Sequence, residues 1–258
     1  MTMRALSLHL HSAGSPNPAT APLDARWTLR VCTPGEDPAA SADPDDWLPA
    51  TVPGVAHLDL VRHGRIPDPF WDRDELQVQH LNQREVVYRC DFQVSRELLE
   101  APRLSLAFAG LDTCATVHLN GAPILQCDNM FLPQEVDLSP RQGGLLREGP
   151  NQLLLRFAPA LPLGQAREAR HGRLAVWNGD PSRVYVRKAQ YHYGWDWGPC
   201  LLTAGPYRPI TLHVYAARLG DIAAPVTLAD DLQSACVALR IETSGNTVGA
   251  LVAYELLD

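Results

Sequence analysis

The stretch "ATVHLNGAPILQC", residues 115–127, contains two short runs of strand-forming residues on either side of Asn120-Gly121. Asparagine followed by glycine supplies the two positive-φ positions that a type I′ turn requires, and such a turn joins two antiparallel strands. The stretch therefore predicts a β-hairpin. The segments on either side of it decide what kind of sheet this hairpin enters.

Outside the hairpin, most segments with a regular pattern are also of the strand type. Strands are expected over 23–31, 86–94, 103–110, 151–159 and 207–215. Apolar residues at every second position define the faces Trp27/Leu29/Val31, Val86/Tyr88/Cys90/Phe92/Val94 and Leu104/Leu106/Phe108. Only residues 53–64 favour a helix, with Pro53-Gly54 before it and Gly64 at its end. Many short strands and one short helix predict an all-β sandwich or barrel.

Three regions follow from this pattern. Residues 1–22 are expected to be a flexible lead-in, and residues 23–215 to form the sandwich. From 216 to 258 the chain offers two or three strands, with "ACVALRIETS" and "GALVAYELLD" pairing across Gly245-Asn246. So few strands cannot bury both of their faces. We therefore interpret 216–258 as the beginning of a second β domain that is cut short.

Charge and composition exclude several classes of protein. The net charge of −7 and the absence of a Lys/Arg cluster argue against nucleic acid as a partner. No run approaches the ~20 apolar residues of a membrane span, and the N-terminus is a poor secretion signal. Six scattered cysteines without a CxxC pair predict reduced thiols. Together these features predict a cytoplasmic protein that contacts neither nucleic acid nor membrane.

Metal, nucleophile and cofactor signatures are missing. The sequence has no HExxH, no GxSxG and no glycine loop that cradles phosphate. His192 and Cys200 would supply at most two ligands of a site that needs three or four. We therefore assign no metal ligand and no cofactor, and a structural calcium site is the alternative that the sequence neither shows nor excludes.

The stretch "RKAQYHYGWDWGP", residues 187–199, is the strongest candidate for a binding site. Six of the chain's eighteen aromatic residues fall between Trp177 and Trp197. A sugar needs flat aromatic surface for its C–H patches and fixed acceptors for its hydroxyls, and an ionised carboxylate accepts two hydroxyl donors. A loop with Trp195, Asp196 and Trp197 supplies both. In the alternative interpretation, the two rings fill the sandwich and Asp196 only caps a turn.

Five blocks carry a resemblance to the β-mannosidases of glycoside hydrolase family 2. They are "VPGVAHLDLVRHGRIPDPFWDRDE" (52–75), "LAFAGLDTCATVHLNGAPILQCDNMF" (106–131), "NQLLLRF" (151–157), the Trp-Asp-Trp stretch and the following "LLTAGPYRPITLHVY" (201–215). The resemblance covers roughly residues 23–215. Positions where the family commonly has tryptophan hold His80 and Val86, and Cys200 stands where a basic residue is frequent.

The resemblance implies a galactose-binding-like jelly roll, then an immunoglobulin-like domain, then a (β/α)₈ barrel with two catalytic glutamates. It implies that Trp195, Asp196 and Trp197 help to hold a terminal mannose in the barrel's pocket. Arg187 and His192 lie beside them in the sequence and either orient the loop or pack. The missing barrel domain would then be the partner of this chain within the full-length enzyme.

No catalytic residue is assigned within this chain. Glu75, Asp112 and Asp128 fall in the matched blocks, but carboxylates of turns and loops are the expected interpretation. The first hypothesis is the N-terminal sugar-binding domain of a retaining enzyme that releases terminal non-reducing β-D-mannose. The alternatives are a stand-alone, non-catalytic carbohydrate-binding sandwich and a purely structural sandwich whose aromatic residues are all core.

Overall fold

The computed structural model of the protein describes residues 5–11, 19–22, 26–38, 46–139, 144–246 and 251–257. Two antiparallel sheets form its main body. The six-stranded sheet has the order β4 (Leu48–Pro49), β3 (Arg26–Cys32), β5 (Glu85–Val94), β10 (Gly149–Ala158), β7 (Cys114–Leu119), β8 (Ala122–Cys127). The four-stranded sheet has the order β2 (Ala19–Pro22), β13 (Ile210–Tyr215), β6 (Arg103–Phe108), β9 (Gln134–Asp137). The all-β prediction is confirmed.

The core of the sandwich consists of the predicted apolar faces of both sheets. The buried residues of β5 and β6 include all eight that the alternation assigned to the interior: Val86, Tyr88, Cys90, Phe92, Val94, Leu104, Leu106 and Phe108. Phe157 of β10 meets Tyr88 edge-to-face, with ring centres 5.9 Å apart. Because successive side chains of a strand point to opposite faces, the period-two pattern placed one full face of each strand in the core.

The predicted hairpin and helix are both present. β7 pairs with β8 across Asn120 (φ 51°) and Gly121 (φ 86°), as a type I′ turn requires. The predicted helix is α1 (Ala56–Arg62), and Gly64 follows it with φ 63°. The short helix α2 spans Arg96–Leu99.

A longer helix, α3 (Ala160–His171), was not predicted. Its first turn contains Pro162, which is tolerated there because the first N–H groups of a helix have no partner inside it. Single-turn 3-10 helices complete the loops: η3 (Asp74–Leu76), η4 (Gln79–Gln83), η6 (Pro181–Tyr185) and η7 (Gln190–His192). No helix in the described part of the chain is long and apolar enough to cross a membrane.

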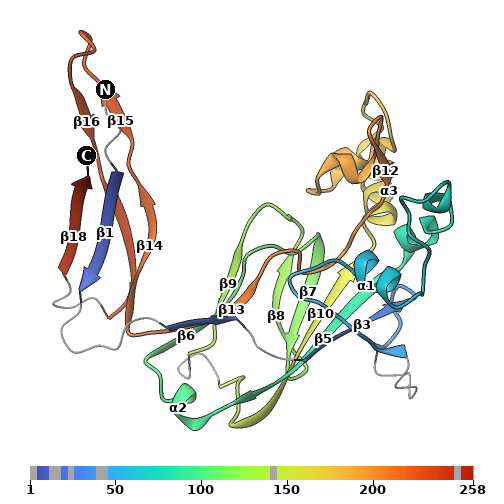
Figure 1. The fold of residues 1–258 in the computed structure, drawn as a ribbon, viewed down its shortest axis with the longest axis horizontal. Coiled ribbons are helices and arrows are strands. Elements are labelled where there is room, and N and C mark those ends of the chain that lie inside the picture. Colours follow the sequence, from blue (N-terminus) through green and yellow to red (C-terminus); the bar gives the residue numbers. More distant parts are fainter. Residues whose placement is uncertain are drawn as a thin grey trace.

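The strands that follow the sandwich pair differently from the prediction. β14 (Ala217–Ala223) pairs with β17 (Arg240–Gly245), and β15 (Val226–Leu228) pairs with β16 (Ala235–Val237). The predicted hairpin across Gly245-Asn246 was wrong, because β18 (Leu251–Leu257) pairs with β1 (Ala5–His11) near the other end of the chain. Figure 1 shows these strands together at one end of the molecule. That they begin an immunoglobulin-like domain stays a prediction.

The predicted flexible lead-in was also wrong for two segments. Residues 5–11 form β1, and residues 19–22 form β2, an edge strand of the four-stranded sheet beside β13. Backbone pairing of these segments uses partners that lie about 190 to 250 positions away in the sequence. The local sequence contains no signal for such distant partners.

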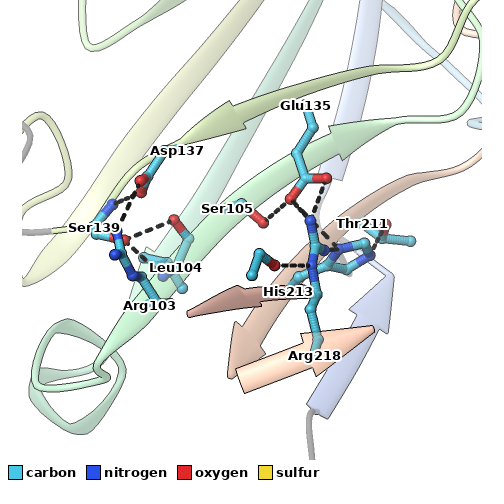
Figure 2. A network of polar contacts seen from close by, with 10 residues as sticks. Arg103, Leu104, Ser105, Glu135, Asp137, Ser139, Thr211, His213 and Arg218 are labelled. Carbon is cyan, nitrogen blue, oxygen red and sulfur yellow. Dashed lines mark hydrogen bonds and ion pairs between the residues drawn. The ribbon is translucent and has the colours of Figure 1, made fainter. Parts of the chain in front are cut away.

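A polar network connects the sandwich to β14 (Figure 2). Nη2 of Arg218 donates to both carboxylate oxygens of Glu135 at 2.5 and 2.6 Å, and Nη1 lies 2.6 Å from Nδ1 of His213. The Arg218 guanidinium also lies over the ring of Tyr215, 4.5 Å from its centre. Burial and the Arg218 charge lower the pKa of His213, which keeps Nδ1 free to accept. Arg218 therefore ties the first strand after the sandwich to both β9 and β13.

Candidate functional site

The Trp-Asp-Trp stretch forms a very short β-hairpin. β11 (Tyr193–Trp195) pairs with β12 (Gly198–Cys200), with Trp195 opposite Gly198. Asp196 and Trp197 are therefore the two residues of the connecting loop. Together with α3, the hairpin lies at the end of the sandwich opposite the C-terminal strands (Figure 1).

The side chains at the tip of this hairpin face solvent. Trp195 is 38% exposed, Trp197 is 69% exposed, and Asp196 is exposed as well. No hydrogen bond or ion pair joins Asp196 to any residue that the structure describes. This arrangement disagrees with rings that fill the sandwich and an aspartate that caps a turn. It leaves a carboxylate free to accept two hydroxyl donors beside aromatic surface.

Neighbouring side chains hold both indole rings. The ring of Tyr191 lies 5.8 Å from that of Trp197, tilted by 43°. The guanidinium of Arg183 lies over the ring of Trp195, 5.6 Å from its centre. Aromatic pairs and cation–π contacts favour particular ring orientations. These contacts therefore orient both indole rings while the rings stay exposed to solvent.

A buried ion pair fastens the segment that leads into the hairpin. Nζ of Lys188 lies 2.6 Å from both carboxylate oxygens of Asp112 and donates to the carbonyl of Thr203 at 2.7 Å. The Thr203 hydroxyl donates to Asp112 at 2.8 Å, and Thr113 donates to the other oxygen. Lys188 and Asp112 are only 2% and 1% exposed. Both charges of this pair are therefore buried and hydrogen-bonded to protein groups.

The role of Asp112 differs from the expectation of an ordinary loop carboxylate. Its backbone exchanges two hydrogen bonds with Gly205, of 2.9 and 3.0 Å, so it binds the chain on both sides of the hairpin. The sequence reasoning missed Lys188 altogether. The sequence did contain a signal for a special role of this residue, because Lys188 is the only lysine among the 22 Lys and Arg residues. A compact ammonium fits a closed site that a planar guanidinium does not.

On its other side, the hairpin rests on η4. Gln79 donates to the carbonyl of Cys200 at 2.8 Å, and Asn82 accepts from the backbone of Leu202 at 3.3 Å. These contacts come from the block around His80, which is itself exposed. Hydrogen bonds from η4 to the backbone therefore support the hairpin and the residues that follow it.

The remaining candidate residues have modest roles in the structure. The side chain of Arg187 is exposed, while its carbonyl accepts from the backbone of Met130 at 3.1 Å. Glu75 accepts from Gln79 through its backbone, and Asp128 forms a partly exposed ion pair with Arg167 at 3.3 Å. The structure places none of these side chains beside Asp196.

Two histidines lie next to the buried ion pair. His57 of α1 is 7% exposed, and neither of its ring nitrogens has a hydrogen-bond partner among the residues that the structure describes. Nδ1 of His192 lies 3.8 Å from Asp112 and 3.4 Å from the Thr203 hydroxyl. Burial, helped by the Lys188 charge, lowers the pKa of each histidine to about 4. The 3.8 Å contact is therefore not an ion pair at neutral pH.

These histidines predict a loss of stability in mild acid. Their pKa is near 6.5 in the unfolded chain and about 4 in the folded protein, so the unfolded state binds more protons below pH 6.5. Stability is thus complete above pH 6.5 and falls as the pH drops towards 4. At 1.36 kcal/mol per pKa unit, each histidine should remove about 2 kcal/mol of unfolding free energy between pH 7 and pH 5.

Urea unfolding at the two pH values measures this loss. His57→Phe should reduce the difference between pH 7 and pH 5, because the phenyl ring cannot take a proton. His63→Phe, a change of an exposed histidine at the end of the same helix, serves as the control. An equal pH dependence in the wild type and in His57→Phe would contradict the assignment.

Metal binding has no support in the described part of the chain, and two of the buried cysteines are unreactive. No group of three or more His, Cys, Asp or Glu side chains is placed there to hold a metal ion. The six cysteines are free in the structure. Burial raises the pKa of Cys90 to about 12 and that of Cys114 to about 11, so both are inert thiols at neutral pH.

Comparison with protein families identifies the domain that carries the hairpin. Residues 27–208 match the family described as glycosyl hydrolase 2 galactose-binding domain-like. A curated relative, beta-mannosidase B of Thermothelomyces thermophilus, is 42% identical over 218 residues, or 84% of this chain and 24% of the relative. Beta-mannosidase B of Aspergillus flavus is 43% identical over 204 residues, or 77% of this chain and 24% of the relative.

Solved structures agree with this result. The crystal structure of a β-D-mannosidase from Dictyoglomus thermophilum matches with a TM-score of 0.73 and 34% identity, over 87% of this chain and 26% of that one. An exo-chitosanase from Amycolatopsis orientalis, at 16% identity and a TM-score of 0.57, shares the fold over 88% of this chain and 24% of its own. The chain thus spans about a quarter of the length of the relatives it matches.

Proposed function

Because this chain belongs to the glycosyl hydrolase 2 family through its galactose-binding-like domain, we propose that it is the N-terminal sugar-binding part of a retaining β-mannosidase. The substrate would be a saccharide with a terminal non-reducing β-D-mannose. The exposed Trp-Asp-Trp hairpin is the observation that carries this proposal. The names of the curated relatives and of the Dictyoglomus structure support the choice of mannose.

The geometry of the hairpin suits a role in binding. Asp196 would accept hydroxyl donors of the sugar, and the two indoles beside it would cover its C–H patches. Retention needs one carboxylic acid for the leaving oxygen and a second carboxylate as nucleophile, roughly 5–5.5 Å apart. We assign neither of them to this chain and expect both on a catalytic domain in the same polypeptide.

The test compares the 258-residue protein with the longer polypeptide that is encoded when the reading frame is extended past codon 258. The longer polypeptide should hydrolyse 4-nitrophenyl β-D-mannopyranoside in preference to the β-glucoside, β-glucosaminide and β-glucuronide. The 258-residue protein should have no measurable turnover. Turnover by the 258-residue protein that depends on one of its own carboxylates would contradict the proposal.

A stand-alone carbohydrate-binding sandwich is the second candidate. The same exposed hairpin favours it, because the hairpin presents binding groups without any catalytic pair. A stop codon directly after codon 258, together with mannoside binding by the 258-residue protein, would favour this candidate over the first.

A further inference from the structure

One face of the Trp195 ring is occupied by a buried cation. Arg183 is only 4% exposed, and its guanidinium carbon lies 5.6 Å from the centre of that ring. Its Nη1 donates to the side-chain carbonyl of Asn178 at 2.9 Å, while Nε has no acceptor in the described part of the chain. No ion pair joins Arg183 to a carboxylate within the described ranges. A buried charge without an acid is costly, and the described residues offset that cost with the Asn178 carbonyl and the ring of Trp195.

The backbone around Arg183 is built to keep the side chain in place. Asp180 caps η6 by accepting from the backbone of Ser182 at 2.9 Å. α3 packs closely on η6, since a Cβ at Gly164 would lie 2.9 Å from the Ser182 carbonyl oxygen. Gly179 has φ +66°, and a Cβ there would lie 3.1 Å from Nη1 of Arg183. The helix and the turn that carry Arg183 therefore leave it little freedom to move.

We propose that Arg183 is a positioning residue for Trp195. Its guanidinium contacts one face of the indole, and the exposed part of the ring stays available to a sugar. The inference rests on the proposed function for the identity of the sugar. The placement of Trp195 by Arg183 is a property of the protein without ligand, and can be tested without one.

The chain offers a matched control with the same chemistry at another place. The guanidinium of Arg89 lies over the ring of Trp47, 4.4 Å from its centre, but Arg89 also pairs with Asp91 at 3.4 Å. Arg89 belongs to β5 in the large sheet rather than to the hairpin region. Loss of either arginine removes an Arg–Trp contact, and only the loss of Arg183 should affect Trp195.

The first measurement uses ¹⁹F NMR of the 258-residue protein labelled with 5-fluorotryptophan. The Trp195 signal is assigned by its absence in Trp195→Phe. In Arg183→Met this signal should broaden at least twofold or split, while that of the buried Trp27 stays unchanged. Arg183→Lys keeps a cation over the ring and should retain one narrow signal, and Arg89→Met should change Trp47 only.

Two results would overturn the proposal. One is an unchanged Trp195 signal in Arg183→Met. The other is equal broadening in Arg183→Lys, which would show that the cation does not place the ring. If the Trp27 signal shows that Arg183→Met does not fold, Asn178→Ala replaces it, because that change releases Nη1. An unaltered Trp195 signal in Asn178→Ala would then overturn the proposal.

The second measurement connects placement to binding in the longer polypeptide. Arg183→Met should raise KM for 4-nitrophenyl β-D-mannopyranoside about tenfold and change kcat less than threefold, since a misplaced platform weakens substrate and transition state alike. Arg89→Met should leave both constants unchanged. Absence of β-mannoside turnover in the wild type would refute the proposed function, and the NMR result would still decide the role of Arg183.

Discussion

Replacing Lys188 by methionine is expected to reduce the free energy of unfolding by about 3–5 kcal/mol, the usual result of breaking a buried ion pair on one side. The ammonium contacts both oxygens of Asp112 at 2.6 Å in a site closed to solvent. Without it, the carboxylate stays buried with only hydroxyl donors. Native domains have about 5–15 kcal/mol of stability in total, so this change should leave the protein close to unfolding.

Urea denaturation at pH 7 measures the effect, and three further variants define its cause. Lys188→Arg should also destabilise, because a larger planar guanidinium does not fit a site in which the lysine side chain is fully buried. Lys188→Met combined with Asp112→Asn should recover much of the loss, since no unpaired charge remains. Arg96→Met breaks an exposed pair with Glu100 and should cost less than about 1 kcal/mol.

A different result would change the interpretation of this cluster. If Lys188→Arg were as stable as the wild type, the presence of lysine rather than arginine at position 188 would have no structural explanation. If the double variant were less stable than Lys188→Met, the carboxylate of Asp112 would be needed for the hydrogen bonds from Thr113 and Thr203 rather than for the ion pair.

Most strands of the sandwich were predictable because their signals are local. The Asn120-Gly121 turn and the period-two faces of β5 and β6 depend on residues within ten positions of one another. The pairing of β18 with β1 depends on residues about 250 positions apart. A strand was predicted at β18 but not at β1, and local periodicity cannot choose the partner of either segment.

The same distinction applies to the candidate site. The aromatic enrichment around Asp196 is visible in a short window, so the hairpin residues could be named from the sequence. The support behind them comes from distant segments: Asp112 lies 76 positions before Lys188, and η4 reaches Cys200 from about 120 positions away. Arg183 is only 12 positions from Trp195, but the 3-10 turn that carries it packs against α3, which begins more than 20 positions earlier.

Asp196→Ala is expected to lower kcat/KM for a β-mannoside about 100-fold in the longer polypeptide, with little effect on folding. Hydrogen bonds to a charged group contribute roughly 1.5–3 kcal/mol each, or about ten- to 100-fold. Two such bonds to the sugar, each at the lower end of this range, would together account for the expected loss. Because Asp196 is exposed and has no partner among the described residues, its removal should change the unfolding free energy by less than about 0.5 kcal/mol.

The comparison of turnover with unfolding separates a binding role from a structural one. Asp196→Asn keeps the shape and one acceptor without the charge, so its kcat/KM should lie between those of the wild type and Asp196→Ala. Asp231→Ala removes another exposed turn aspartate, which accepts from the backbone of Gln233 at 3.0 Å, and should leave kcat/KM unchanged. A parallel fall of stability and turnover in Asp196→Ala would show that the carboxylate holds the hairpin together. Unchanged turnover in a stable variant would mean that the sugar is bound elsewhere.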